Sequence, residues 1–89
     1  MPDLILRIVN EKGLHARASA KFVEVVEAHD ADAEVTKDGM TVSGDSIMGL
    51  LMLAASRGTT IQVRTSGAEA EKLAGALEAL VADGFGEEF

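Results

Sequence analysis

Four residue types are absent or scarce, and each absence narrows the possible functions. The 89 residues include no cysteine, tryptophan or tyrosine, and a single proline. Without cysteine the chain has no disulfide framework and no thiolate metal site, which fits a cytoplasmic location. With only three phenylalanines, the core must be aliphatic, and the strands offer no aromatic platform for stacking RNA bases.

Long apolar runs and an excess of basic charge are also missing. No segment approaches the roughly 20 apolar residues of a transmembrane helix, and Asp3 and Arg7 interrupt the short N-terminal run, which argues against a signal peptide. The net charge is −7, whereas phosphate contacts with nucleic acid need a basic surface. We therefore expect a cytoplasmic protein with no membrane insertion and no nucleic-acid partner.

What is present is the composition of a small folded domain. Hydrophobic residues make up 47% of the chain and charged residues 26%, the balance of a globular protein with a packed core. A length of 89 residues corresponds to one small domain. We expect a single domain over residues 1–89, in which residues 84–89 form a loose tail.

Hydrophobic periodicity predicts the element order βαββαβα. Apolar and polar residues alternate in four segments, and apolar residues recur at helical spacing in three others. Asp38-Gly39 predicts a hairpin turn, and Ser66 with Glu69 has the spacing of a capping box. The order predicts an α+β fold, an open two-layer sandwich of a four-stranded antiparallel sheet with three helices on one face. The expected strands are 4–9, 33–36, 40–42 and 60–64; the expected helices are 16–28, one between Ser46 and Gly58, and one between Ser66 and Gly84.

A histidine stands directly before the first predicted helix, so His15 lies at or next to its N-cap. Unpaired N–H groups and the helix dipole make such a position an anion site, and a neutral imidazole is a nucleophile near pH 7. A phosphoryl group on His15 could be bound by the Arg17 side chain and by the backbone N–H groups of Ala16 and Arg17. On position alone, a solvent-exposed histidine without a role is the commoner case.

The surroundings of His15 favour the functional interpretation. Gly13 allows the backbone to turn closely at the site. Residues 7–21 hold four basic residues and one acidic residue inside an acidic chain, and a basic island of this kind suits a small anionic ligand. The basic residues are Arg7, Lys12, Arg17 and Lys21.

The predicted middle helix carries more apolar residues than one face can hide. With Leu50, Leu53 and Ala54 toward the core, its other apolar residues cannot all be buried, and methionine-rich surfaces suit partners of varied shape. The alternative is that these residues fill the core. We expect a docking surface, with Lys21 and Arg17 at its charged edge and a centre of Ile47, Met48, Leu51 and Met52.

Ser46 is the expected N-cap of this helix. Most serines in such positions act as caps only. Ser46, however, begins the helix that carries the apolar surface, and a phosphate there would add about −1.5 to −2 charges beside Ile47 and Met48. It is therefore a candidate regulatory site.

Two segments resemble motifs of one family, the HPr phosphocarriers of the bacterial phosphoenolpyruvate-dependent phosphotransferase system. Gly13-Leu14-His15-Ala16-Arg17 is similar to the phosphohistidine motif, and Ser46-Ile47-Met48-Gly49-Leu50 to the regulatory serine segment. The resemblance implies phosphorylation of His15 on Nδ1 by enzyme I and transfer to an enzyme IIA-type acceptor, with Arg17 steadying the phosphate. It also implies HPr kinase/phosphorylase as a partner at Ser46, a monomer, no cofactor and the HPr-like fold.

The chain departs from the family pattern in three places. Ala18 stands where the family usually has proline, Lys12 where many relatives have Asn or Ser, and Asp45 where some have lysine. These changes bear on the identity of the partners, and they favour a nitrogen-related or regulatory branch over sugar uptake.

Two other classes of function remain as alternatives. One is an HPr-like regulatory binding module that acts through Ser46 and the methionine-rich surface without phosphorelay; His15 counts against it. The other is a free-standing enzyme, but no metal-ligand set, nucleophile–base pair or carboxylate pair is present, so we expect a carrier. His29 is isolated and receives no role.

Overall fold

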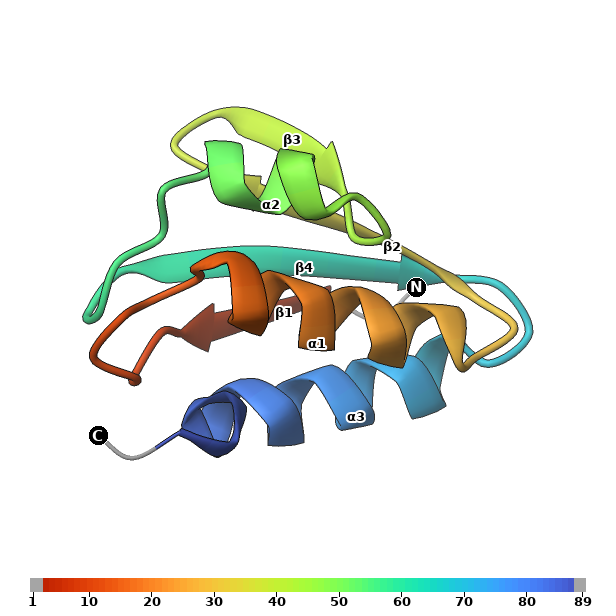
Figure 1. Cartoon of the computed structure of the whole chain (residues 1–89). Coiled ribbons are helices and arrows are strands. Elements are labelled where there is room, and N and C mark those ends of the chain that lie inside the picture. The colour runs from red at the N-terminus through yellow and green to blue at the C-terminus, as the bar shows by residue number, and fades with distance from the viewer. Residues whose placement is uncertain (1–2, 88–89) are drawn as a thin grey trace.

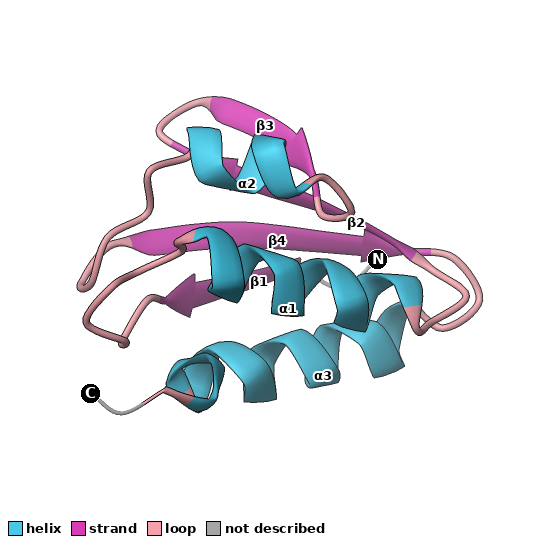
Figure 2. Ribbon diagram, in the orientation of Figure 1, coloured by secondary structure: helices cyan, strands magenta, loops and turns pink. Residues whose placement is uncertain are grey.

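The computed structural model describes residues 3–87, which form a four-stranded antiparallel sheet, three α-helices and a 3₁₀ turn. The helices cover one face of the sheet (Figures 1 and 2), and the strand order is β1-β4-β2-β3. The predicted α+β fold and element order are confirmed. The elements are β1 Asp3–Arg7, α1 Ala16–Glu27, β2 Asp32–Lys37, β3 Met40–Ser43, α2 Ile47–Met52, β4 Thr60–Ser66, α3 Ala70–Ala82 and η1 Gly84–Gly86.

The register of the sheet sorts its side chains into a buried and an open face. Val63 of β4 pairs with Leu4 of β1 on one side and with Val35 of β2 on the other. Since side chains alternate along a strand, paired residues share a face, and Val63 and Val35 are fully buried under the helices. Ile5 lies on the opposite, open face, where the residue is 76% exposed.

Two long helices close the core. On α1 the buried side chains recur at helical spacing, as do those on α3. Together with the strands they form one continuous hydrophobic cluster. Within residues 3–87, no helix combines the length and the apolar character that crossing a membrane requires. The buried residues of the helices are Ala18, Ser19, Phe22, Val23 and Val26 on α1, and Ala70, Leu73, Ala74, Leu77 and Val81 on α3.

The middle helix is shorter than its sequence pattern predicts. α2 ends at Met52, six residues before Gly58, and Ala54 adopts a left-handed conformation with φ of 51°. This turn carries the chain back so that the carbonyl oxygen of Ala55 accepts a hydrogen bond from the backbone N–H of Leu14 at 2.9 Å. A tertiary contact therefore overrides helix propensity, and Ala54, expected in the core, is exposed.

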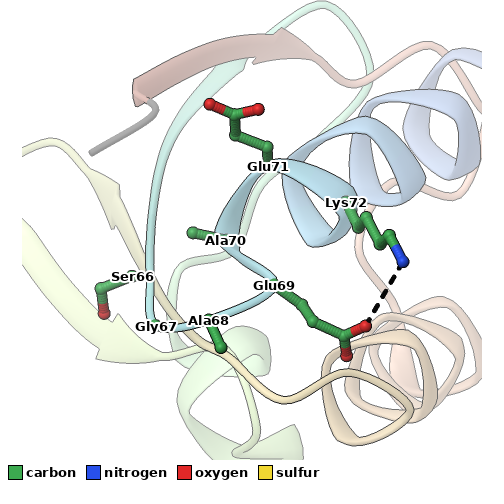
Figure 3. A pocket seen from close by; sticks show the side chains of 7 residues that line it. All are labelled: Ser66, Gly67, Ala68, Glu69, Ala70, Glu71 and Lys72. Atoms are coloured by element: carbon green, nitrogen blue, oxygen red, sulfur yellow. Dashed lines mark ion pairs between the residues drawn. The ribbon is translucent and has the colours of Figure 1, made fainter.

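The predicted capping box before α3 is wrong. Ser66 ends β4, and the N-cap Glu69 makes no capping hydrogen bond to α3. Its carboxylate instead accepts a hydrogen bond from the backbone N–H of Asp30 at 2.7 Å. Figure 3 shows Glu69 beside Lys72, 3.7 Å away, at the rim of a hollow lined by residues 66–72. The contact between Glu69 and Asp30 ties the start of α3 to the loop after α1.

The prediction of a loose tail is wrong for residues 84–87; residues 88 and 89 lie outside the described part. Gly84–Gly86 form a 3₁₀ turn, and Phe85 is fully buried. The Phe85 carbonyl also accepts a hydrogen bond from Nζ of Lys21 at 2.6 Å. Burying an aromatic ring contributes on the order of 2–3 kcal/mol, enough to hold this turn against the domain.

Candidate functional site

His15 is the N-cap of α1, as predicted. Its backbone is extended, with φ of −77° and ψ of −177°, and its Nδ1 accepts a hydrogen bond from the backbone N–H of Arg17 at 3.2 Å. The side chain keeps 25% of its surface exposed. The ring is therefore held at the positive end of a twelve-residue helix and stays within reach of a partner.

The turn before His15 needs glycine at position 13. Gly13 has a φ of +64°, and a Cβ there would lie 2.4 Å from the carbonyl oxygen of Ala55. The next residue, Leu14, is buried and binds that same carbonyl through its N–H. The close approach of Gly13 to Ala55 and the hydrogen bond from Leu14 to Ala55 fix the backbone on the N-terminal side of His15. The loop after α2, which holds Ala55, therefore helps to set the position of the imidazole.

Two residues that sequence reasoning did not single out contact this site. Asn10 is fully buried, and its Nδ2 donates to the Gly13 carbonyl at 2.8 Å and to Oε1 of Glu87 at 2.9 Å. The other carboxylate oxygen, Oε2, pairs with Nε2 of His15. The pKa of Glu87 is lowered, and the hydrogen bond from Asn10 is the largest cause. Desolvation raises this pKa in part, and the hydrogen bond with His15 lowers it further. Glu87 is thus an anion at neutral pH.

The predicted basic island is present beside His15, with one change. A hollow of about 280 Å³ is lined by Lys12, Arg17 and Lys21 together with Glu11, Gly86 and Glu87. Arg7 lies elsewhere, at the end of β1, beside a different hollow. Three cations around a concave surface next to an imidazole form a setting in which a doubly charged phosphate can be held.

The surface of α2 has the predicted character. Ser46 is its N-cap, and Oγ accepts a hydrogen bond from the backbone N–H of Gly49 at 3.0 Å. Met48 is 70% exposed and Met52 64%, whereas Leu50 is fully buried. Ile47 is exposed and Leu51 is half-buried. The helix therefore presents an apolar surface outward instead of filling the core.

The remaining histidine, His29, binds to its own helix. His29 Nδ1 bonds to the carbonyl oxygen of Val25 at 2.7 Å, one turn back on α1. Within residues 3–87, no group of three or more His, Asp or Glu side chains could hold a metal ion.

The sequence gives only an indirect sign of the two residues that were missed, Asn10 and Glu87. Phe85 is one of three phenylalanines, and an aromatic residue in a supposed tail indicates an anchored segment. That indication suggests that the segment around Phe85 packs on the domain, but it does not say against which residues. Contacts between Asn10, His15 and Glu87 span more than 70 residues of chain and are set only by folding.

Comparison with known proteins gives a consistent result. Residues 5–83 match a family model described as "PTS HPr component phosphorylation site". The phosphocarrier protein HPr of Neisseria meningitidis serogroup A is 45% identical over 82 residues, which cover 92% of each chain. The phosphocarrier protein NPr of Escherichia coli is 33% identical over 84 residues, covering 93% of each.

A solved structure agrees with these relatives. HPr-C-His from Thermoanaerobacter tengcongensis has a TM-score of 0.95 to this chain, with 35% sequence identity and full coverage of both chains. The likeness therefore extends over the whole fold as well as over the sequence motifs.

Proposed function

The chain belongs to the HPr family of the bacterial phosphotransferase system, a family of phosphocarriers and not of enzymes, and we propose that it accepts a phosphoryl group on His15 from enzyme I. The phosphorylated chain then donates the group to an enzyme IIA-type acceptor. His15 is the acceptor residue, Arg17 steadies the phosphate, and Lys21 and the exposed side of α2 contact the partners.

The geometry of His15 carries this proposal. The Arg17 N–H points at Nδ1, so Nδ1 is the ring nitrogen that lacks a hydrogen and has a lone pair for attack on phosphorus. Once Nδ1 is phosphorylated, we expect this N–H, the N–H of Ala16 and the Arg17 guanidinium to bind phosphate oxygens. The same groups serve acceptance and donation, which a carrier requires.

The test is phosphorylation of the purified chain by enzyme I and phosphoenolpyruvate. We expect one acid-labile phosphate on the parent protein, none on His15→Ala, and a slower single-turnover rate for Arg17→Glu, because the new carboxylate repels the phosphate. His29→Ala is the matched control and should be phosphorylated like the parent. Phosphate on another residue of His15→Ala would contradict the assignment. An unphosphorylated parent would favour the regulatory binding module.

Regulation at Ser46 is the second part of the proposal. An ATP-dependent serine kinase of the HPr kinase/phosphorylase type would phosphorylate Ser46, where the dianion is tolerated by the start of α2 but lies next to the exposed apolar side chains. Support comes from the exposure of Ile47 and Met48 beside this cap. Phosphoserine would then act on docking and leave the fold intact.

The downstream acceptor is proposed to belong to the nitrogen-related or regulatory branch. Ala18, Lys12 and Asp45 are the departures that favour it, and a relative named NPr is among the similar proteins. Transfer from the phosphorylated chain to a nitrogen-type and to a sugar-type enzyme IIA, measured side by side, decides between the branches. Faster transfer to the sugar-type acceptor would reject this part of the proposal.

A further inference from the structure

The C-terminal turn places a carboxylate against the reactive imidazole. Three hydrogen bonds hold this segment: Lys21 Nζ to the Phe85 carbonyl at 2.6 Å, and the N–H groups of Gly86 and Glu87 to the carbonyls of Asp83 and Gly84, each at 3.1 Å. With Phe85 buried beneath, the turn is an anchored part of the domain. Only 14% of the Glu87 side chain is exposed, so the carboxylate is held in place.

The hydrogen-bond chemistry of Asn10 has only one consistent assignment. Its two partners, the Gly13 carbonyl and a Glu87 carboxylate oxygen, can only accept. The amide must therefore present its NH₂ group to both, which leaves Oδ1 without a partner among residues 3–87. Asn10 thus joins the turn before His15 to the C-terminal turn and directs the second oxygen of Glu87 at the ring.

The same reasoning assigns the tautomer of His15. Nε2 faces a carboxylate oxygen and must donate, so it carries a hydrogen. Nδ1 faces the N–H of Arg17 and must accept, so it carries a lone pair. Without Glu87, only the Arg17 N–H, at 3.2 Å from Nδ1, would favour this tautomer, and the form with the hydrogen on Nδ1 would become more populated. With Glu87, the nitrogen at the helix N-terminus is the free nucleophile.

We propose that Glu87, itself positioned by Asn10, is a positioning residue of phosphoryl transfer that keeps the hydrogen of His15 on Nε2 and supports the charge that forms on the ring. This inference rests on the proposed function of His15. Its basis is the set of contacts among Asn10, His15 and Glu87, which joins the turn before α1 to the turn after α3.

The transfer step shows why a carboxylate at Nε2 matters. The Nδ1 lone pair forms a bond to the phosphorus of the donor's phosphohistidine, and the donor's N–P bond breaks with its electron pair staying on the donor imidazole. The accepting ring keeps its Nε2 hydrogen and becomes positive, next to the Glu87 anion. In the reverse sense, the retained hydrogen allows His15 to leave as a neutral imidazole when the group passes on. A buried aspartate supports a catalytic histidine in serine proteases by the same electrostatics.

Glu87→Gln and Glu87→Ala test this inference, with Glu78→Gln on α3 as a control that removes one equal charge from an exposed site. Single-turnover phosphorylation by phosphorylated enzyme I measures the rate. Partners that orient a metal-bound histidine are worth about 10- to 100-fold in activity, and by analogy we expect a loss of that size for Glu87→Ala and a smaller loss for Glu87→Gln. The Glu78→Gln rate should equal that of the parent.

A second readout separates positioning from structure. ¹⁵N chemical shifts of His15 report which ring nitrogen carries the hydrogen, and we expect Nε2–H in the parent and in Glu78→Gln but a mixture of tautomers in Glu87→Ala. Melting curves check the fold, and if the alanine variant loosens the turn, the glutamine variant decides. An unchanged rate or an unchanged tautomer overturns the inference. If the parent is not phosphorylated, the proposed function fails, and the tautomer alone then decides whether Glu87 positions the ring.

Discussion

At the scale of single residues, the position of His15 depends on neighbouring residues that are not themselves reactive. Gly13 supplies a left-handed turn that brings the backbone against Ala55, and Asn10 binds the carbonyl of Gly13 from inside the protein. Both are buried. Changes at either should act first on stability and only then on the chemistry of the imidazole.

Asn10→Ala should lower the free energy of unfolding by about 1–3 kcal/mol, because it leaves buried acceptors without their donor. Urea unfolding of the two proteins measures the difference. Glu11→Ala, on the neighbouring exposed residue, is the control and should stay within about 0.5 kcal/mol of the parent. If the free energy of unfolding of Asn10→Ala also stays within about 0.5 kcal/mol of the parent, water replaces the lost hydrogen bonds.

At the scale of elements, α2 is a short helix with a buried side and an exposed apolar side, and the exposed side is the one proposed for docking. Leu50 enters the core and Ser46 caps the N-terminus, while Met48 and Met52 face outward. Six residues give little helical stability of their own. The helix persists because of its cap and its buried side, so substitutions on the outward side should change binding without unfolding the protein.

Ser46→Asp and Ser46→Ala together separate a switch from a cap. Aspartate caps helices as well as serine does, whereas alanine costs about 0.5–2 kcal/mol. If Ser46 is a switch, the aspartate variant keeps its melting temperature but is phosphorylated more slowly by enzyme I, and the alanine variant melts earlier but reacts at the parent rate. Equal rates for the two variants would leave Ser46 as a cap alone. A rate that follows the loss of stability would indicate unfolding.

Met48→Asp should weaken the binding of enzyme I and of the acceptor, because it puts a charge at the centre of the apolar surface. Titration calorimetry with each partner measures the affinity. Ile5→Asp is the matched control, an equally exposed apolar residue on the open face of the sheet; it should leave binding unchanged. Both variants should stay within about 0.5 kcal/mol of the parent in stability. Equal losses of affinity would place docking elsewhere.

At the scale of the whole molecule, two glutamates join segments that are distant in sequence. Glu69 binds the backbone of Asp30, and Glu87 binds Asn10 and His15. The hydrogen bond from the Asp30 N–H is the main cause that lowers the pKa of Glu69, and the one from Asn10 is the main cause for Glu87. Both contacts therefore depend on ionised carboxylates, and acid should weaken them.

The sign of this effect follows from the lowered pKa values. Stabilisation is complete above the ordinary glutamate pKa of about 4.3 and is lost as the pH falls through the lower pKa of the folded protein. Urea unfolding between about pH 2 and 6 should show a fall in stability toward acid that is shallower in Glu69→Gln/Glu87→Gln than in the parent. Glu78→Gln should keep the parent's slope. A double variant with the same slope as the parent would show that neither contact contributes.

The sequence by itself determined the layout of this protein. The alternation of Leu4, Leu6 and Ile8, the helical stripe of α3 and the Asp38-Gly39 turn led to the observed element order, because periodicity and turn chemistry are local properties that burial reinforces. His15 as N-cap and Ser46 as N-cap were likewise predictable, since a cap depends on a few neighbouring residues.

Only the tertiary structure decided where α2 ends, what Glu69 binds and where residues 84–87 lie. α2 stops at Met52 because Ala55 is needed against Leu14, Glu69 turns to Asp30 because β4 brings the loop within reach, and Glu87 reaches His15 because Phe85 enters the core. Each outcome is a contact between residues far apart in the chain. Such contacts compete with local propensity through packing and burial, which no short stretch of sequence contains.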